Sequence, residues 1–377
     1  MKPNSKKHSK LTRSRARRMA LARERRGAFA RIKAGLPTFL VGLVIVAGLV
    51  GAYVLWRSPS MLQKQEADVS FFQIATGSVG GTYYPVGKAI ASVISKPPGG
   101  VPCDDGGKCG VDGLIAIAKT ATGSVANVRA VNSGHIESAL AQADVVAWAA
   151  EGKGPFVTDG KFENLRVIAS LYPEAVHLVV AKSSGIARVE DLRGKRVSID
   201  RFGSGTQIDA LLILNAYGLH KDDYIQHTID ASQATDMILS GDLDAYFLIA
   251  GTPSLAVADL AERSMINLIP IDGEPAEKLK AENTFFVSTK IAADTYKNIS
   301  EVKTISVRAL WITHTAVSGQ VIHDVLKALW RPENEKSFLQ GHAKTKLIKP
   351  QTALNGTAIP LHRGARAYYI NQGLLKR

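Results

Sequence analysis

Three short turns rich in glycine, serine and threonine carry the residue types from which proteins build anion sites. They are TGSVGGTYY at residues 76–84, TATGSVANV at 120–128 and RFGSGTQID at 201–209, and each stands where a predicted strand gives way to a helical pattern. A helix N-terminus offers unpaired N–H groups and the positive end of the helix dipole, and glycine allows close approach to the backbone. One such turn usually only caps its helix. Three in matching positions favour a site that holds a carboxylate with neutral donors.

Sequence motifs of catalytic and nucleotide-binding sites are absent. The turn at 77–82 lacks both the G-K-[ST] of a phosphate-binding loop and the G-x-G-x-x-G of a dinucleotide site. The chain has no G-x-S-x-G and no H-E-x-x-H. His135 and His177 are expected to satisfy local hydrogen bonds. We therefore expect no enzyme, no catalytic residue, no cofactor and no metal site.

Alternating strand and helix patterns position the three turns. Strands are expected at 71–77, 113–124, 138–144, 192–200, 224–229, 244–251 and 266–272, and helices at 82–96, 125–136, 201–219, 232–243, 252–263, 319–330, 333–341 and 363–375. This β-α-β-α order predicts an α/β fold with a mostly parallel sheet covered on both faces.

Two long extended runs, at 165–186 and 302–314, interrupt this alternation. They predict two crossover strands between two α/β lobes, which form a clamshell with its ligand in the cleft. We place lobe 1 at 70–178 and 275–377, and lobe 2 at 179–274.

The formal charge of +14 is concentrated at the N-terminus, where residues 1–35 hold 13 Lys and Arg and one acid, Glu24. The chain after Trp56 is close to neutral, which argues against a nucleic-acid partner. Leu36 to Trp56 is uncharged and would span ~30 Å as a helix, the thickness of a bilayer core. The basic tail should stay in the cytoplasm. We predict an uncleaved transmembrane anchor at 36–56 and a linker at 57–69. The alternative is a long signal segment cut after Ala52.

The two cysteines, Cys103 and Cys109, flank five residues that favour a turn, in VPCDDGGKCGV. Such a loop can bring the pair within disulfide range, and an exported chain would permit the bond. Free thiols and a metal site are the alternatives, although no histidine lies nearby to complete a metal site.

The segment IATGSVGGTYYPVGKAIASVI resembles the opening of the TAXI family, the extracytoplasmic solute-binding subunits of tripartite ATP-independent periplasmic (TRAP) transporters. Four more blocks resemble that family in order: CGVDGLIAIAKTATGSVANVRAVNSGHIESALAQADV, DLRGKRVSIDRFGSGTQIDALLILNAYGL, LDAYFLIAGTPS and IPLHRGARAYYINQGL. The resemblance runs from about Phe71 to the C-terminus. It implies a type II periplasmic-binding-protein fold and capture of a small organic acid (dicarboxylate, 2-oxoacid or acidic amino acid) for TRAP membrane subunits.

Carried over position by position, the resemblance implies a set of ligand-binding residues. They are Ser78, Gly81, Thr82, Tyr83, Ser124, Asn127, Gln142, Ser204, Gly205 and Thr206. Backbone N–H groups and hydroxyls would hold the carboxylate, Gln142 would orient the ligand, and Tyr83 would pack over its carbon skeleton.

Other side chains have two interpretations. Tyr84, Tyr246 and Phe247 either face the cleft or pack in the core. Arg129, Arg166 and Arg201 are either a charged clamp for the carboxylate or surface residues.

The chain departs from the family in its N-terminus, because family members are usually exported as free proteins or lipoproteins. A basic tail followed by an anchor places the body on the periplasmic side of the bacterial inner membrane, with the N-terminus inside. Tethering raises the effective concentration near a transporter. It also suits a membrane-anchored ligand-sensing receptor, the second hypothesis.

Overall fold

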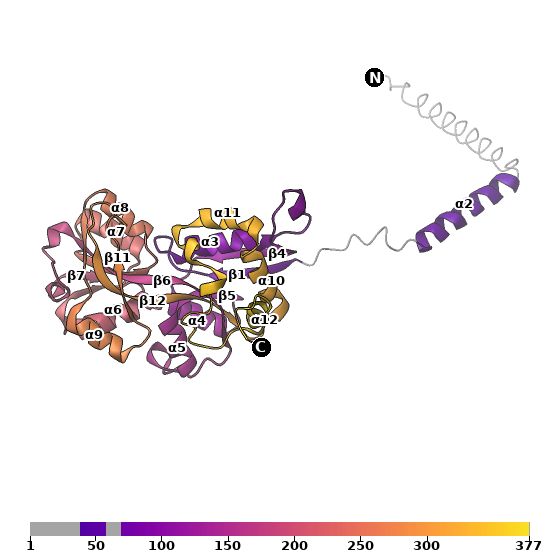
Figure 1. Ribbon diagram of the computed structural model, residues 1–377. Helices are drawn as coiled ribbons and strands as arrows, with labels where there is room; N and C mark the ends of the chain where they lie inside the picture. The colour runs from indigo at the N-terminus through magenta and orange to yellow at the C-terminus, as the bar shows by residue number, and fades with distance from the viewer. Residues whose placement is uncertain (1–37, 58–68, 377) are drawn as a thin grey trace, which may run out of the picture. The chain divides into compact units, whose positions relative to one another are not determined.

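The computed structural model describes residues 38–57 and 69–376 (Figure 1). The chain forms two units, Met1–Glu66 and Ala67–Arg377. In the first unit, helix α2 (Thr38–Arg57) overlaps the predicted anchor. Across the two described ranges, no helix combines the length and hydropathy needed to cross a membrane. The predicted tail at 1–35 and most of the linker at 57–69 lie outside the described residues.

The second unit is built on one mixed sheet. Its strands lie in the order β4 (Leu114–Lys119), β1 (Ser70–Ala75), β5 (Ser138–Gln142), β12 (Val302–His314), β6 (Leu165–Ala181), β9 (Ala245–Ala250), β7 (Arg196–Ser198) and β8 (Ile225–His227). β10 (Ile266–Ile269) also pairs with β6, and β11 (Val287–Ile291) with β12. We call β4-β1-β5 with its helices the first half and β9-β7-β8 with its helices the second half.

Strands run parallel within each half, but β6 and β12 are antiparallel to the strands beside them. The sheet is therefore mixed rather than mostly parallel. The reason is that β6 carries the chain from the first half to the second and β12 carries it back, so the two crossover strands oppose each other.

Helices cover both faces of each half (Figure 1). The first half has α3 (Tyr83–Ile94), α4 (Ser124–Asn132), α5 (Ala143–Glu151), α10 (Gly319–Leu329), α11 (Pro332–Gly341) and α12 (Arg363–Asn371), and the second has α6 (Gly205–Ala216), α7 (Ala231–Ser240), α8 (Leu255–Glu262) and α9 (Gly273–Glu282). Short 3-10 helices are η2 (Cys103–Asp105), η3 (Gly154–Phe156), η4 (Lys182–Ser184), η5 (Val189–Leu192), η6 (Lys221–Asp223), η7 (Ala343–Leu347) and η8 (Pro350–Thr352).

The sequence patterns missed the helices α5 and α9 and the strand β11 (Figure 1). Gln142 is both the last residue of β5 and the N-cap of α5, so no turn signal separates the two. In α9 only Ala276 and Leu279 are buried, which leaves a weak apolar period.

The predicted disulfide is confirmed, with the Cα atoms of Cys103 and Cys109 4.8 Å apart. It lies in the excursion between β2 (Ser95–Lys96) and β3 (Val111–Asp112), which pair as a separate small sheet.

Four hydrophobic clusters fill the two faces of the two halves. Along β6, side chains up to Tyr172 pack in the first-half clusters and those from Ala175 onward in the second-half clusters. Along β12 the change falls between Val307 and Ala309, where the pairing register also shifts after Arg308. Each half thus has cores of its own, joined through one narrow band of β6 and β12.

The predicted lobe boundaries stay a prediction. The cores change near residues 173–174, a few residues before the predicted boundary at 178–179. Ala276 and Leu279 of α9 pack in a second-half cluster, although the predicted division assigns them to lobe 1.

Candidate functional site

The candidate site follows from the repeated topology of the two halves. In each, the first strand lies between the other two, and every parallel strand leads into a helix at the same edge of the sheet. Ligands of open α/β sheets bind beyond the carboxyl ends of such strands, where the strand order reverses. The turns after β1, β4 and β7 therefore meet at one place.

A cavity of about 50 Å³ lies where these turns meet. Its lining comprises Gly77, Ser78, Gly81, Thr82, Tyr83, Thr122, Gly123, Ser124, Gln142, Glu174, Asp200, Ser204, Gly205, Thr206, Leu248 and Ile249. Nine of the ten sequence-predicted ligand residues belong to this set, from segments up to 128 positions apart in the chain. Their contact with a ligand remains a prediction.

Asn127 is the predicted residue that the structure does not bring to the cavity. Its side chain is 1% exposed, and its Nδ2 donates to the carbonyls of Thr76 (2.6 Å) and Leu140 (2.8 Å). These bonds tie the carboxyl ends of β1 and β5 together. Asn127 therefore supports the turn rather than lining the pocket.

Most hydroxyls of the lining already have partners in the protein. Ser204 Oγ accepts from Gln207 N (3.0 Å) and caps α6, and Thr206 Oγ1 accepts from Ile249 N (3.1 Å). Thr82 Oγ1 donates to the carbonyl of Gly251 (2.9 Å). Ser78 Oγ is the predicted hydroxyl without a hydrogen-bond partner among the described residues, so it is the one most available to a ligand.

Several hydrogen bonds cross from one half to the other around the cavity. Ser254 Oγ donates to Gly80 O (3.0 Å), and Ala126 N donates to Gly203 O (3.0 Å). The bond from Thr82 to Gly251 also crosses. The halves are therefore closed on each other in this structure.

The floor of the cavity contains Glu174, at the point of β6 where the cores change. It is 1% exposed, and its Oε2 accepts from the Tyr83 hydroxyl at 2.7 Å. Burial raises the pKa of Glu174 to about 8, and the Tyr83 hydrogen bond and the charge of Lys344 act in the opposite direction. Tyr83 thus uses its hydroxyl to position this acid, a role beyond its predicted packing over the ligand.

Asp200 brings a second carboxyl group to the cavity, in the turn after β7. Its φ of 72° lies in the left-handed region, a strained conformation for a non-glycine residue that often accompanies function. Burial raises the pKa of Asp200 to about 7, opposed by hydrogen bonds from the Arg201 N–H and the Ser204 side chain.

Gln142 joins the two halves rather than presenting a free amide. Its Nε2 donates to Asp209 Oδ2 at 2.5 Å, and its Oε1 accepts from Ser124 Oγ at 3.2 Å. Asp209, on α6, is completely buried and interacts with Asp144 on α5. The Gln142 amide, predicted to orient the ligand, is thus itself held in place by the buried carboxyl pair behind the cavity.

The profile of the NMT1-like family matches residues 74–373, which is most of the chain. The chain belongs to the NMT1-like family.

Solved structures of solute-binding proteins are similar to this NMT1-like chain. The alkanesulfonate-binding protein SsuA from Xanthomonas axonopodis pv. citri, bound to MOPS, is 14% identical over 82% of this chain and 96% of its own, with a TM-score of 0.43. MatC from Rhodopseudomonas palustris, with bound malate, is 11% identical over 80% and 97%, with a TM-score of 0.48. An ancestral arginine-binding protein, bound to arginine, is 13% identical over 74% and 98%, with a TM-score of 0.42.

The side chains with two interpretations lie outside the cavity lining. Tyr246 and Phe247 are buried in hydrophobic clusters, and the Tyr84 ring contacts Lys88. The three arginines bind elsewhere: Arg129 pairs with Asp159, Arg166 donates to the carbonyls of Glu163 and Leu165, and Arg201 contacts Asp230.

The two histidines have local partners, as expected. Buried His177 bonds the Tyr296 hydroxyl, and burial lowers its pKa to about 4. His135 bonds Ser133.

Sequence reasoning missed the two acids of this NMT1-like cavity, and a signal for each existed. Glu174 is the one acid in the mostly apolar run 165–181, and a lone carboxyl in a buried strand is costly unless it has a partner or a function. Asp200 is the last residue of the strand predicted at 192–200, directly before the turn at 201–209.

Proposed function

We propose that this protein captures a small organic acid in the cleft between its two halves and delivers it to the membrane subunits of a TRAP-type transporter without chemical change. The observation that carries the proposal is the cavity, because three turns from both halves line the same space. The transporter class rests on the sequence resemblance to the TAXI family.

The first half offers the binding place for a carboxylate. Helices α3 and α4 begin at Thr82 and Gly123, and neither N-cap makes a side-chain capping bond. Among the described residues, Tyr83 and Ser124, the first residue of each helix, have backbone N–H groups without a hydrogen-bond partner, and both residues line the cavity. The N–H of Ala126, in the first turn of α4, is already bonded across the cleft. Ser78 adds a hydroxyl without a partner among the described residues.

The acids of the lining favour a ligand that also carries a positive group. Glu174 and Asp200 line the cavity, and its sixteen lining residues include no Lys, Arg or His. The raised pKa of both carboxyls, about 8 for Glu174 and about 7 for Asp200, favours their protonated forms in the empty cleft. A ligand ammonium would lower these pKa values and pair with the resulting carboxylates, whereas a second ligand carboxylate would raise them further. Among the three classes of acid, an acidic amino acid therefore fits best.

The size of the cavity requires a moving cleft. A water needs about 10–15 Å³ of such volume, so about 50 Å³ holds only a few waters and is too small for a C4–C6 acid. Entry therefore requires the cross-half hydrogen bonds to break, and the occupied cleft closes less tightly than the empty one.

We also propose that the body works on the periplasmic side of the inner membrane, held by residues 36–56 with the N-terminus inside. The support for this is the uncharged 21-residue segment and the basic tail before it. Extraction of membranes with carbonate tests it: an anchored chain stays in the membrane pellet, and a chain released by cleavage after Ala52 appears in the periplasmic fraction.

The ligand proposal is tested by thermal unfolding of the full chain with L-glutamate, 2-oxoglutarate and succinate. The chain is first unfolded and refolded to remove any carried-over solute. A ligand that binds the folded state raises Tm with concentration, and we expect the largest rise with L-glutamate. L-glutamate and 2-oxoglutarate differ only at the amino or keto group, so their difference reports on Glu174 and Asp200.

Two serine variants serve as a matched pair. Ser78→Ala should reduce the Tm rise caused by L-glutamate, and Ser133→Ala, on the exposed end of α4, should not. No rise with any of the three acids contradicts capture of a small acid. A larger rise with succinate than with L-glutamate contradicts the ammonium preference but not capture.

A further inference from the structure

The buried pair Asp144 and Asp209 lies behind the cavity, one residue from each half. Asp144 is in the first turn of α5 and Asp209 is in α6, and both are 0% exposed. Neither belongs to the cavity lining. Gln142 connects the two elements, because it is the N-cap of α5 and its Nε2 donates to Asp209 Oδ2 on α6.

Two ionised carboxylates are an unstable arrangement at this place. Within the described residues, both oxygens of Asp144 and Oδ1 of Asp209 have no hydrogen-bond partner. Two carboxylates cannot satisfy each other, because neither has a proton to donate. A single proton on Asp209 turns the contact into a carboxyl–carboxylate hydrogen bond, one of the strong kinds. Gln142 Nε2 already donates to the other oxygen of Asp209.

The surroundings decide which of the two takes the proton. Asp144 is in the first turn of α5, where the helix dipole favours a negative charge. Asp209 faces Asp144, Gln142 and, from β6, Glu174; burial first, and then the charge of Asp144, raises its pKa well above the usual range. Burial also raises the pKa of Asp144, which the Asp209 side chain opposes.

Other ionisable groups reach the pair only through Glu174. Tyr83, from α3, donates to Glu174, and Lys344, from η7, lowers the pKa of Glu174 by its charge. Lys344 Nζ itself donates to Thr252 Oγ1 at 3.1 Å. The charges of the pair are therefore compensated by a proton rather than by a cationic side chain pointing at it.

We propose that Asp144 and Asp209 form a proton-binding site that is completed when the two halves close, so that closure takes up a proton from solution. The proposal rests on the proposed function only in taking closure of the cleft as the working motion. In the open state each carboxyl faces water and ionises with an ordinary pKa near 4. In the closed state the pair keeps one proton at neutral pH.

The sign of the pH effect follows from this difference. The closed state binds more protons than the open state between the ordinary carboxyl pKa and the raised one. Closure is therefore favoured at low pH and weakened as pH rises, by up to about tenfold in the closed-to-open ratio per pH unit for one proton.

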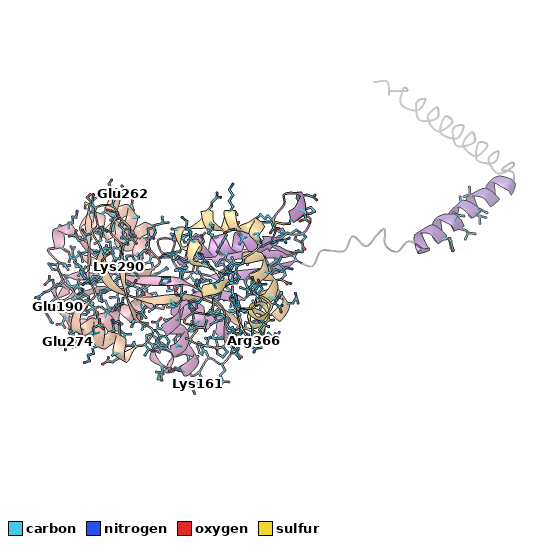
Figure 2. All side chains as sticks on the ribbon, viewed as in Figure 1. Lys161, Glu190, Glu262, Glu274, Lys290 and Arg366 are labelled. Atoms are coloured by element: carbon cyan, nitrogen blue, oxygen red, sulfur yellow. A yellow bond between two sulfur atoms is a disulfide. The ribbon has the colours of Figure 1, made fainter. Side chains whose placement is uncertain are left out.

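The experiment measures closure without any solute. Spin labels are placed on the full chain at Lys161→Cys and Glu274→Cys, two exposed positions on opposite halves (Figure 2). The native cysteines are joined in a disulfide and do not take a label. Pulsed electron–electron double resonance then gives the closed fraction from pH 5 to pH 9.

The wild-type closed fraction should fall as pH rises. In Asp209→Asn the side chain keeps its shape and can donate to Asp144, but it has no proton to lose. The closed fraction of this variant should therefore depend less on pH, by an amount that corresponds to about one proton. Asp144→Asn disrupts the pair at its first-half member and should also reduce the dependence of the closed fraction on pH. Asp236→Asn, on the exposed face of α7, is the matched control and should follow the wild type. Glu174 and Asp200 supply whatever response remains.

Two outcomes overturn the proposal: a pH response in Asp209→Asn and Asp144→Asn as steep as in the wild type, or a wild-type closed fraction that responds to sodium chloride but not to pH. A flat pH response in a protein that still binds L-glutamate overturns this inference alone. A steep response in a protein that binds none of the three acids supports it while the proposed ligand class fails.

Discussion

The two halves of the body share a strand order but differ in how the helices that follow their strands are capped. In the first half, α3 and α4 start without side-chain caps, and among the described residues the N–H groups of Tyr83 and Ser124 at their starts have no partner. In the second half, Ser204 caps α6 and Asp230 caps α7, and the turn contributes Asp200. The same topology thus gives the first half a surface rich in hydrogen-bond donors. It gives the second half an acidic surface whose helix ends are already capped by its own side chains.

This difference separates binding from closure. A carboxylate can be held by the first half alone, because its helix ends are open. The second half contributes acids and the α6 terminus, which contacts the first half when the cleft shuts. Substitutions in equivalent turns should therefore affect different properties.

The largest effect is expected from the turn glycines. A Cβ on Gly205 would lie 1.6 Å from Gln142 Oε1 and 2.9 Å from Ser124 Oγ, whereas a Cβ on Gly81 would meet nothing nearer than 3.6 Å. Gly205→Ala must displace the hydrogen-bonded Gln142, so its affinity for L-glutamate should fall on the order of 100-fold. Gly81→Ala should stay within about threefold. Isothermal titration calorimetry measures both, and equal losses would erase the contrast between the halves.

A second effect concerns Glu174, which lies between the halves. Glu174→Gln should lower the affinity for L-glutamate by at least about tenfold, because a charged hydrogen bond to the ligand is lost. The affinity for 2-oxoglutarate should change much less. Titration calorimetry of both acids on the two proteins gives the comparison. Equal losses for both acids would show that Glu174 does not recognise the amino group.

The same variant tests the pH dependence of stability. With a pKa of about 8 in the folded chain, Glu174 keeps its proton where an unfolded carboxyl, with a pKa near 4.3, has lost it. Its contribution is complete below about pH 4.3 and is lost as pH rises through 8. Urea unfolding at pH 6 and pH 9 should show a smaller loss of stability at high pH in Glu174→Gln than in wild type. An unchanged loss would mean that the other buried acids account for it.

The smallest effect compares a serine from each half. Ser204→Ala removes the cap of α6 and should lower the free energy of unfolding by about 1 kcal/mol. Ser78→Ala removes a hydroxyl without a protein partner among the described residues and should change the free energy of unfolding by less than about 0.5 kcal/mol. It should nevertheless lower the affinity for L-glutamate. Urea midpoints report the first quantity and Tm shifts with L-glutamate the second. A stability loss in Ser78→Ala would assign its hydroxyl to the fold.

Much of the fold was predictable because local patterns agree with the final structure. The run predicted at 302–314 is β12 residue for residue, and the run at 165–186 contains all of β6. The helix predicted at 319–330 differs from α10 by one residue. Apolar strands bounded by turns keep their period whatever surrounds them. α9 was missed because its burial depends on the second-half cluster and not on its own apolar period.

For the site, the turns could be predicted but the use of their side chains could not. Gly-rich sequence at strand-to-helix junctions marks where a cavity forms, and nine predicted residues line it. Whether Ser204 caps a helix and Ser78 does not depends on the local turn conformation. Asn127 has the right position in sequence, but its amide is held by Thr76 and Leu140.

The sequence by itself determined the positions of most strands, of the three turns and of the disulfide, because each depends on residues close together in the chain. Only the tertiary structure decided the electrostatics of the cleft. Tyr83 and Glu174 are 91 positions apart, and Gln142 and Asp209 are 67 apart. Folding buries these groups together, and burial changes the pKa of a carboxyl by an amount that no local pattern contains.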